Sequence, residues 1–155
     1  MKGAWHRFRN LSNQQRRDFF CGLFLLPLAD VLLRIYNFQS LQRSLRPHQG
    51  YSTDEPDNRS ARVQEARSAA RMIHAASRYG IASGNCLSRS LALCWLLRRR
   101  GIPAELRIGG KKNVEAFEAH AWVEVANVVV NDGEDVGKRY APFDGQVTRA
   151  MIEGK

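Results

Sequence analysis

The hydrophobic pattern of the chain changes its period once, about two thirds of the way along. Up to that point apolar residues recur every three or four positions, as on the buried face of a helix, most clearly over residues 59–80 and 86–100. Beyond it they alternate, as in a strand with one buried face, over 104–108 and 119–125, and a β-prone valine run follows at 128–130. Helices followed by a small antiparallel sheet predict an α+β fold.

The 155 residues are enough for one domain with its own core, and their composition divides them into three segments. Residues 1–46 form an apolar-rich helical region, residues 47–58 a polar loop rich in turn formers, and residues 59–155 the main core. A second, mostly polar loop is predicted from Gly109 to Glu118, between the first two strands. We expect a single compact unit overall.

The longest apolar run extends from Phe19 to Leu33, about 15 residues, which is short of the roughly 20 that cross a bilayer. Pro27 and Asp30 also interrupt it. We therefore predict no membrane span, and a run that is either buried or turned toward a partner protein. The candidate docking residues in it are Phe19, Phe20, Phe24 and Leu25.

Two helices are expected within this N-terminal region. Ser12 or Asn13 is the expected cap of the first, and a kink is predicted at Pro27, because proline removes a helical hydrogen bond and its ring clashes with the preceding turn. The second helix is predicted to run from about Ala29 to Leu45.

Composition excludes several classes of protein. The net charge of +9 attracts acidic partners in general, but it selects none and fits a solvated basic face equally well, so no nucleic-acid partner is inferred. Three cysteines and no secretory signal pattern predict reduced thiols in a cytoplasmic protein. No close pair of metal ligands is present, so neither a metal nor a cofactor is expected.

Cys86 is the cysteine best placed for nucleophilic chemistry. It opens the predicted helix, with Asn85 as its cap, and the N–H groups and dipole of a helix N-terminus favour a thiolate. Cys21 and Cys94 lie within apolar helical stretches and are expected to be buried. The backbone N–H of Cys86 is the natural first donor to an oxyanion, and the side chain of Asn85 or Tyr79 is an open choice for the second.

His120 is the candidate base for this thiol, since an imidazole can pair with a thiolate and later protonate a leaving amine. It stands in the predicted strand AHAWVEV, where two small alanines flank it and leave room for an approaching group.

Asp132 is the candidate acceptor that fixes the tautomer of the histidine. A three-residue turn at 125–127 would pair Glu124 with Val128 and set His120 opposite Asp132 on one face of the hairpin. A two-residue turn would shift Asp132 by one position and remove this match. The asparagine in the turn tolerates the left-handed conformation, so the three-residue turn is open. The fallback acids are Glu124, Asp135 and Asp144.

Further side chains near this site have two readings each. Arg89 and Ser90, on the first turns of the Cys86 helix, either contact a substrate or pack. Trp122 shares a strand face with His120 and is either a wall of the cleft or part of the core.

Three runs within residues 86–132 form a specific pattern, namely CLSRSLALCWLLRRRGIPAELRIG, then FEAHAWVEV, then VVND. An N-terminal run accompanies them and reads FLLPLADVLLRIYNFQSLQRSL. Together they resemble the transglutaminase-like leader peptidases of lasso-peptide biosynthesis, over most of residues 18–144. The resemblance implies a papain-like core in which a cysteine-bearing helix packs on a small antiparallel sheet, and a catalytic triad of Cys86, His120 and Asp132.

The resemblance also implies a function. In that family the triad removes the leader from a ribosomally made precursor peptide, so that an asparagine-synthetase-like cyclase can close the lasso ring. The chain lacks the winged-helix-like recognition domain of longer members, so a separate leader-recognition protein is expected. Two alternatives remain, a transglutaminase-like acyl transferase acting on an amine, and a non-catalytic basic adaptor.

Overall fold

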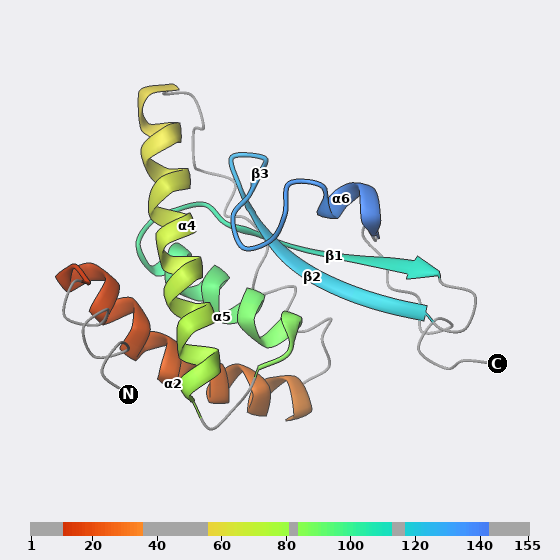
Figure 1. The fold of residues 1–155 in the computed structure, drawn as a ribbon, viewed down its shortest axis with the longest axis horizontal. Helices are drawn as coiled ribbons and strands as arrows, with labels where there is room; N and C mark the ends of the chain where they lie inside the picture. The colour runs from red at the N-terminus through yellow and green to blue at the C-terminus, as the bar shows by residue number, and fades with distance from the viewer. Residues whose placement is uncertain (1–10, 36–55, 81–83, 113–116, 143–155) are drawn as a thin grey trace.

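The computed structural model describes residues 11–35, 56–80, 84–112 and 117–142. Helices pack beside a curled antiparallel sheet, so the predicted α+β class is confirmed (Figure 1). The long helices are α2 (Asn13–Ile35), α4 (Pro56–Tyr79) and α5 (Cys86–Arg99). The four-stranded sheet has the order β3-β2-β1-β4, with β1 at Glu105–Lys112, β2 at Phe117–Val125, β3 at Val128–Val129 and β4 at Ala141–Pro142, and a short helix α6 at Val136–Arg139.

Helix α2 starts where the sequence predicts and continues further than predicted. Ser12 caps it, because its Oγ accepts from the N–H of Gln15 while the side chain of Gln15 accepts from the N–H of Ser12. The helix runs through Pro27 without ending, so the prediction of a separate helix from Ala29 is wrong. Pro27 is exposed, and water can satisfy the carbonyl that its ring leaves unbonded. The predicted end at Leu45, with most of the 47–58 loop, lies outside the described residues.

Helix α2 runs antiparallel to α5, and side chains of α2 bind both ends of α5. The buried carboxylate of Asp18 pairs with Arg100 at the C-terminal cap of α5. The carboxylate of Asp30 accepts a 2.7 Å hydrogen bond from the hydroxyl of Ser88, in the first turn of α5. The polar interruption of the apolar run at Asp30 therefore holds the helix end from which Cys86 projects.

Strand β1 extends to Lys112, into the segment predicted as a loop from Gly109. Gly109 and Gly110 pair with β2 on one side and with β4 on the other. A Cβ added at Gly109 would lie 2.8 Å from the carbonyl oxygen of Ala141 and 3.0 Å from the Trp122 ring. The glycines therefore allow a close approach of neighbouring chains within a strand and do not mark a turn.

The β2–β3 hairpin has a two-residue turn, so the three-residue turn considered from the sequence is wrong. Glu124 pairs with Val129, and the two turn residues, Ala126 and Asn127, have φ of +50° and +62°. Positive φ at both positions is typical of the type I′ turn, whose twist matches that of the flanking strands. The strand register alone would thus leave Asp132 out of line with His120.

The chain leaves the hairpin ladder at Asn131, and the side chain of this residue takes over from the backbone. Its Oδ1 accepts from the N–H of Val123 at 2.7 Å, and its Nδ2 donates to Ser90 Oγ at 2.9 Å. The Ser90 hydroxyl in turn donates to the carbonyl of Ala121 at 3.0 Å. We call this set, Ser90, Asn131 and the backbone of Ala121 and Val123, the polar junction. It joins α5 to β2 and to the segment that carries Asp132.

Replacing Asn131 with alanine should destabilise the protein by about 2 kcal/mol, because it leaves the N–H of Val123 unpaired in the core and removes a partner of Ser90. Urea unfolding should show a lower midpoint with an unchanged slope. Gln64→Ala, which truncates an exposed amide on α4, is the matched control and should change stability by less than about 0.5 kcal/mol. Equal midpoints for the two variants would contradict the role given to the junction.

Candidate active site

Cys86 occupies the first position of α5, as predicted, and is half-buried. Asn85 caps this helix, because its Oδ1 accepts from the N–H of Ser88 at 2.8 Å. The other two cysteines differ from Cys86 and from each other. Cys94 is fully buried, and burial raises the pKa of its thiol to about 11. Cys21 is exposed on α2, which corrects the expectation that it would be buried.

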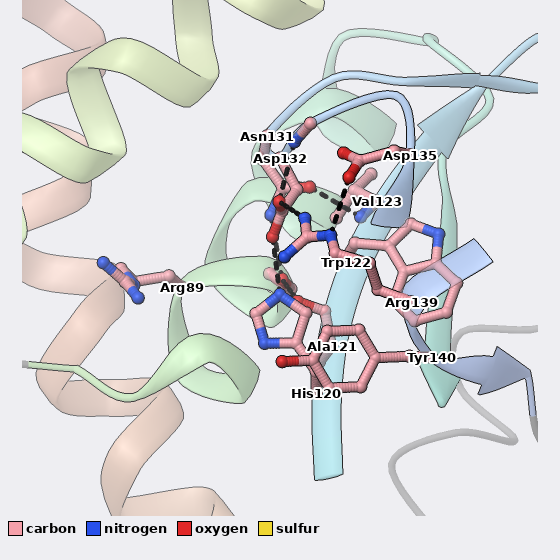
Figure 2. A network of polar contacts seen from close by, with 12 residues as sticks. Arg89, His120, Ala121, Trp122, Val123, Asn131, Asp132, Asp135, Arg139 and Tyr140 are labelled. Atoms are coloured by element: carbon pink, nitrogen blue, oxygen red, sulfur yellow. Dashed lines mark hydrogen bonds and ion pairs between the residues drawn. The ribbon is translucent and has the colours of Figure 1, made fainter. Parts of the chain in front are cut away.

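His120 and Asp132 form a direct pair. Nε2 of His120 donates to Oδ2 of Asp132 at 2.5 Å, and a hydrogen bond to an ionised carboxylate is stronger than one between neutral groups (Figure 2). The contact forms although the hairpin register is not the one considered from the sequence, because Asp132 lies beyond the end of the ladder and turns back toward β2. Since Asp132 holds Nε2, Nδ1 is the ring nitrogen left for chemistry.

Asp132 is held from several sides. Its Oδ1 accepts from the N–H of Gly133 at 2.7 Å and from the guanidinium of Arg139 at 3.0 Å, and Arg139 also pairs with Asp135. Burial alone raises the pKa of Asp132, but the hydrogen bonds from His120 and Gly133, with the neighbouring positive charge, hold that pKa below its ordinary value of 3.8. The carboxylate therefore stays ionised wherever a cysteine–histidine pair works.

Two aromatic rings fix the plane of the imidazole. The Tyr140 ring stacks on His120 with 4.8 Å between centroids, and the Trp122 ring lies nearly parallel at 6.5 Å. Tyr140 is anchored through its hydroxyl, which donates to Glu118 at 2.6 Å. Trp122 is almost fully buried, and its indole N–H donates to Glu124, so it is core behind the histidine and not a wall of the cleft.

A cleft of about 210 Å³ opens between α4, α5 and the sheet, and it brings the three predicted triad residues together. Its lining comes from α4, α5, β2 and the segment after β3, and consists of Ala70, Ile73, His74, Cys86, Arg89, Leu93, His120, Ala121, Asn131 and Asp132. Cys86 and His120 stand on different walls, and no hydrogen bond joins them in the described part of the chain. Such contacts are often long without substrate and tighten when it binds.

The structure separates the remaining predicted residues. Arg89 lines the cleft, whereas Ser90 is fully buried in the polar junction, so the substrate-contact reading of Ser90 is corrected to a packing one. Asn85 does not line the cleft, and its side-chain oxygen is used by the helix cap. Tyr79 is exposed and contacts Phe19. Of the fallback acids, Glu124 binds Trp122 and Arg107, Asp135 binds Arg139, and Asp144 lies outside the described residues.

The proposed docking residues also divide into two pairs. Phe20 and Phe24 are 58% and 71% exposed, whereas Phe19 and Leu25 pack against the core. Further exposed apolar side chains continue the face of α2 that starts at Phe20, namely Leu28, Val31 and Ile35.

Sequence reasoning missed four residues of the site. His74 and Asn131 line the cleft, and Arg139 and Tyr140 hold the Asp132–His120 pair. His74 lies within the predicted helix 59–80, where only its place next to the apolar position of Ile73 points toward the cleft. Arg139 and Tyr140 follow a loop, where no periodicity reports which way a side chain points.

The described residues contain neither a metal-ligand cluster nor a helix suited to span a membrane. No group of three or more His, Cys, Asp or Glu side chains is arranged to hold a metal ion among them. None of their helices combines the length and the apolar character required to cross a bilayer.

Arg139→Gln should raise the pKa of Asp132 toward 3.8, because it removes one cationic donor to the carboxylate. Carbon-13 NMR titration of the Asp132 carboxyl measures this directly. Since folding lowers that pKa, the ionised carboxylate stabilises the fold above the ordinary value, and this stabilisation is lost as pH falls through the lower folded value. The variant should thus be less stable than the native protein at pH 6, with the difference shrinking at about pH 3 and below. Arg139→Lys should retain part of the shift, and identical titrations in all three proteins would refute the assignment.

The geometry above agrees with the comparison against known protein families. The family model that describes the transglutaminase-like superfamily matches residues 31–143. This range is most of the chain and includes α4, α5 and all four strands. No curated protein and no solved structure was found to match. This superfamily is associated with cysteine peptidase and acyl-transfer chemistry, in keeping with a cleft that holds Cys86, His120 and Asp132. The chain belongs to the transglutaminase-like superfamily.

Proposed function

We propose that the protein is a cysteine peptidase that removes the leader from a ribosomally made lasso-peptide precursor, with Cys86, His120 and Asp132 as its triad. One observation carries the catalytic part, namely that the thiol at the start of α5 shares a cleft with an imidazole whose Nε2 is bound by a carboxylate. The leader-peptidase part rests on the resemblance of residues 86–132 to that family.

The chemistry follows from the two ring nitrogens of His120. Asp132 holds Nε2–H, so Nδ1 accepts the proton of the Cys86 thiol. The sulfur attacks the carbonyl carbon of the bond between leader and core, and a C–S bond forms as the carbonyl oxygen takes up negative charge. The C–N bond then breaks, and the amine of the core leaves with the proton from Nδ1.

Water completes the turnover. His120 takes a proton from the water that attacks the thioester, and the leader leaves with a new carboxylate while the proton returns to the sulfur. The N–H of Cys86 is at the first position of α5, where a helix offers it no partner of its own, and it is the first donor to the oxyanion in both steps. The low pKa of Asp132 supports this cycle, because a carboxylate stabilises the imidazolium that forms twice in it.

Acyl transfer to an amine is the second candidate, since the superfamily match supports it equally. The two differ in what resolves the thioester. A candidate precursor, its recognition protein and the enzyme are incubated in water enriched in oxygen-18, and the products are read by mass. Hydrolysis places one heavy oxygen in the new C-terminus of the leader. An amide at that position, without label, would replace the peptidase proposal with transfer.

Cys86→Ala and His120→Ala should each reduce leader cleavage by at least about 10³-fold, and Asp132→Asn by about 10²- to 10⁴-fold. Cleavage is followed by mass under single-turnover conditions. Cys21→Ser is the matched control, since it removes an exposed thiol from α2 and should leave the rate unchanged. Full activity in Cys86→Ala would favour the adaptor reading, in which the basic surface and not the thiol carries the function.

The separate leader-recognition protein is proposed to dock on the exposed apolar face of α2 around Phe20 and Phe24. Burying two such phenylalanines contributes several kcal/mol, enough to decide a weak complex. Phe20→Ser with Phe24→Ser should therefore weaken the binding of that protein at least about tenfold, measured by calorimetry with thermal unfolding as the check on folding. Phe117→Ser, the same change at a half-exposed phenylalanine of β2, is the control. Equal affinities for both variants would remove the docking proposal.

A further inference from the structure

Arg89 is a cation on the wall of the cleft that lacks a carboxylate of its own. Its guanidinium meets Nδ1 of His74 at 3.2 Å, and the described ranges of the chain provide no acidic partner for it. Carboxylates pair with five other described arginines, namely Arg34, Arg67, Arg100, Arg107 and Arg139, whereas Arg89 lines the cleft and contacts an imidazole. Figure 2 shows Arg89 and Arg139 on opposite sides of the His120–Asp132 pair.

The contact with His74 orients Arg89 without neutralising it. A guanidinium can only donate, so Nδ1 of His74 accepts and the ring hydrogen is on Nε2. A neutral imidazole leaves the full positive charge on Arg89 and leaves further N–H donors for another acceptor. Helix α4 thus holds the arginine side chain in place from behind, while its charge stays available to a ligand.

The position of Arg89 relative to the Cys86 thiol determines which part of a bound ligand Arg89 can contact. It follows Cys86 by three positions on α5, a spacing that puts the two Cβ atoms about 5–6 Å apart on one face of the helix. Apolar side chains of Ala70, Ile73 and Leu93 line the same cleft. A group bound by the Arg89 guanidinium and the carbonyl that Cys86 attacks therefore occupy one cleft of about 210 Å³.

We propose that Arg89, oriented by His74, is an anion subsite that binds a carboxylate of the substrate beside the cleaved bond. The cleaved bond is internal to a peptide, so the carboxylate belongs to an aspartate or glutamate side chain adjacent to that bond. This inference rests on the proposed peptidase function and adds a substrate class to it.

Alkylation of the thiols tests the subsite without knowledge of the substrate. Iodoacetate and iodoacetamide modify the same sulfur and differ in one negative charge, so the ratio of their rates at Cys86 reports local attraction of a carboxylate. The ratio cancels changes in the reactivity of the thiol itself. Exposed Cys21 gives the reference ratio in the same molecule, and about 0.15 M salt screens the general field of the basic protein beyond about 8 Å.

The iodoacetate to iodoacetamide ratio at Cys86, relative to Cys21, should fall about three- to tenfold in Arg89→Gln and recover in part in Arg89→Lys. Arg99→Gln is the matched control, since it removes the same charge ten residues further along α5, about 15 Å away, and should not change the ratio. A ratio at Cys86 equal to that at Cys21, or unaffected by Arg89→Gln, would overturn the subsite. A Cys86 as inert to both reagents as buried Cys94 would overturn the nucleophile as well, and so separates the two failures.

The precursor gives the second measurement. Replacing the acidic residue beside the cleaved bond with its amide should lower kcat/KM about tenfold for the native enzyme and leave the already reduced value of Arg89→Gln unchanged. An equal loss with both enzymes would show that the carboxylate is recognised elsewhere, and would overturn the proposal.

Discussion

The polar junction is the constraint on which the site depends. Cys86, His120 and Asp132 come from a helix, a strand and an irregular segment, and packing of apolar surfaces alone lets such elements slide over one another. Hydrogen bonds have directions and fixed lengths. The hydroxyl of Ser90 and the amide of Asn131 therefore set where α5 and the Asp132 segment stand relative to β2. Because Ser90 and Val123 are buried, losing one of these bonds leaves an unpaired polar atom in the core, which makes alternative arrangements costly.

Three consecutive residues of α5, Ser88 to Ser90, contact three different parts of the structure because of helix geometry. Successive side chains of a helix point about 100° apart, so neighbours in the sequence face different surroundings. Ser88 faces α2 and binds Asp30, Arg89 faces the cleft, and Ser90 faces the sheet. The start of this helix thus carries its anchor to the helical layer, a charge that faces the cleft and its anchor to the sheet. Cys86 opens the helix, so both anchors lie within about one turn of its sulfur.

The sequence was sufficient to predict the fold class and to identify Cys86, His120 and Asp132 as the residues at the centre of the cleft. It was not sufficient to predict the backbone geometry that brings His120 and Asp132 into contact. Period and capping identified Asn85 and Cys86 correctly, because local backbone physics decides them. The hairpin turn was misjudged, because a register depends on whether Ala126 adopts positive φ, which alanine rarely does. The His120–Asp132 contact survives that error because Asp132 is not in the ladder at all. Arg139 ends α6 and Tyr140 lies between α6 and β4, elements of four and two residues that leave no periodic signal.

Polar groups that hold the fold together differ from those that can bind a ligand in how far their hydrogen bonds are satisfied within the protein. Asn131, Ser90 and Asp132 use their hydrogen-bonding groups within the fold, and each fixes another residue. Besides the Nε2–H of His74, three groups that line the cleft keep hydrogen-bonding capacity in the described structure: the thiol of Cys86, Nδ1 of His120 and the guanidinium of Arg89. A carbonyl carbon at the sulfur, a proton at Nδ1 and a carboxylate at Arg89 are the complements of these three groups, and an acidic peptide segment supplies the first and the last of them in one ligand.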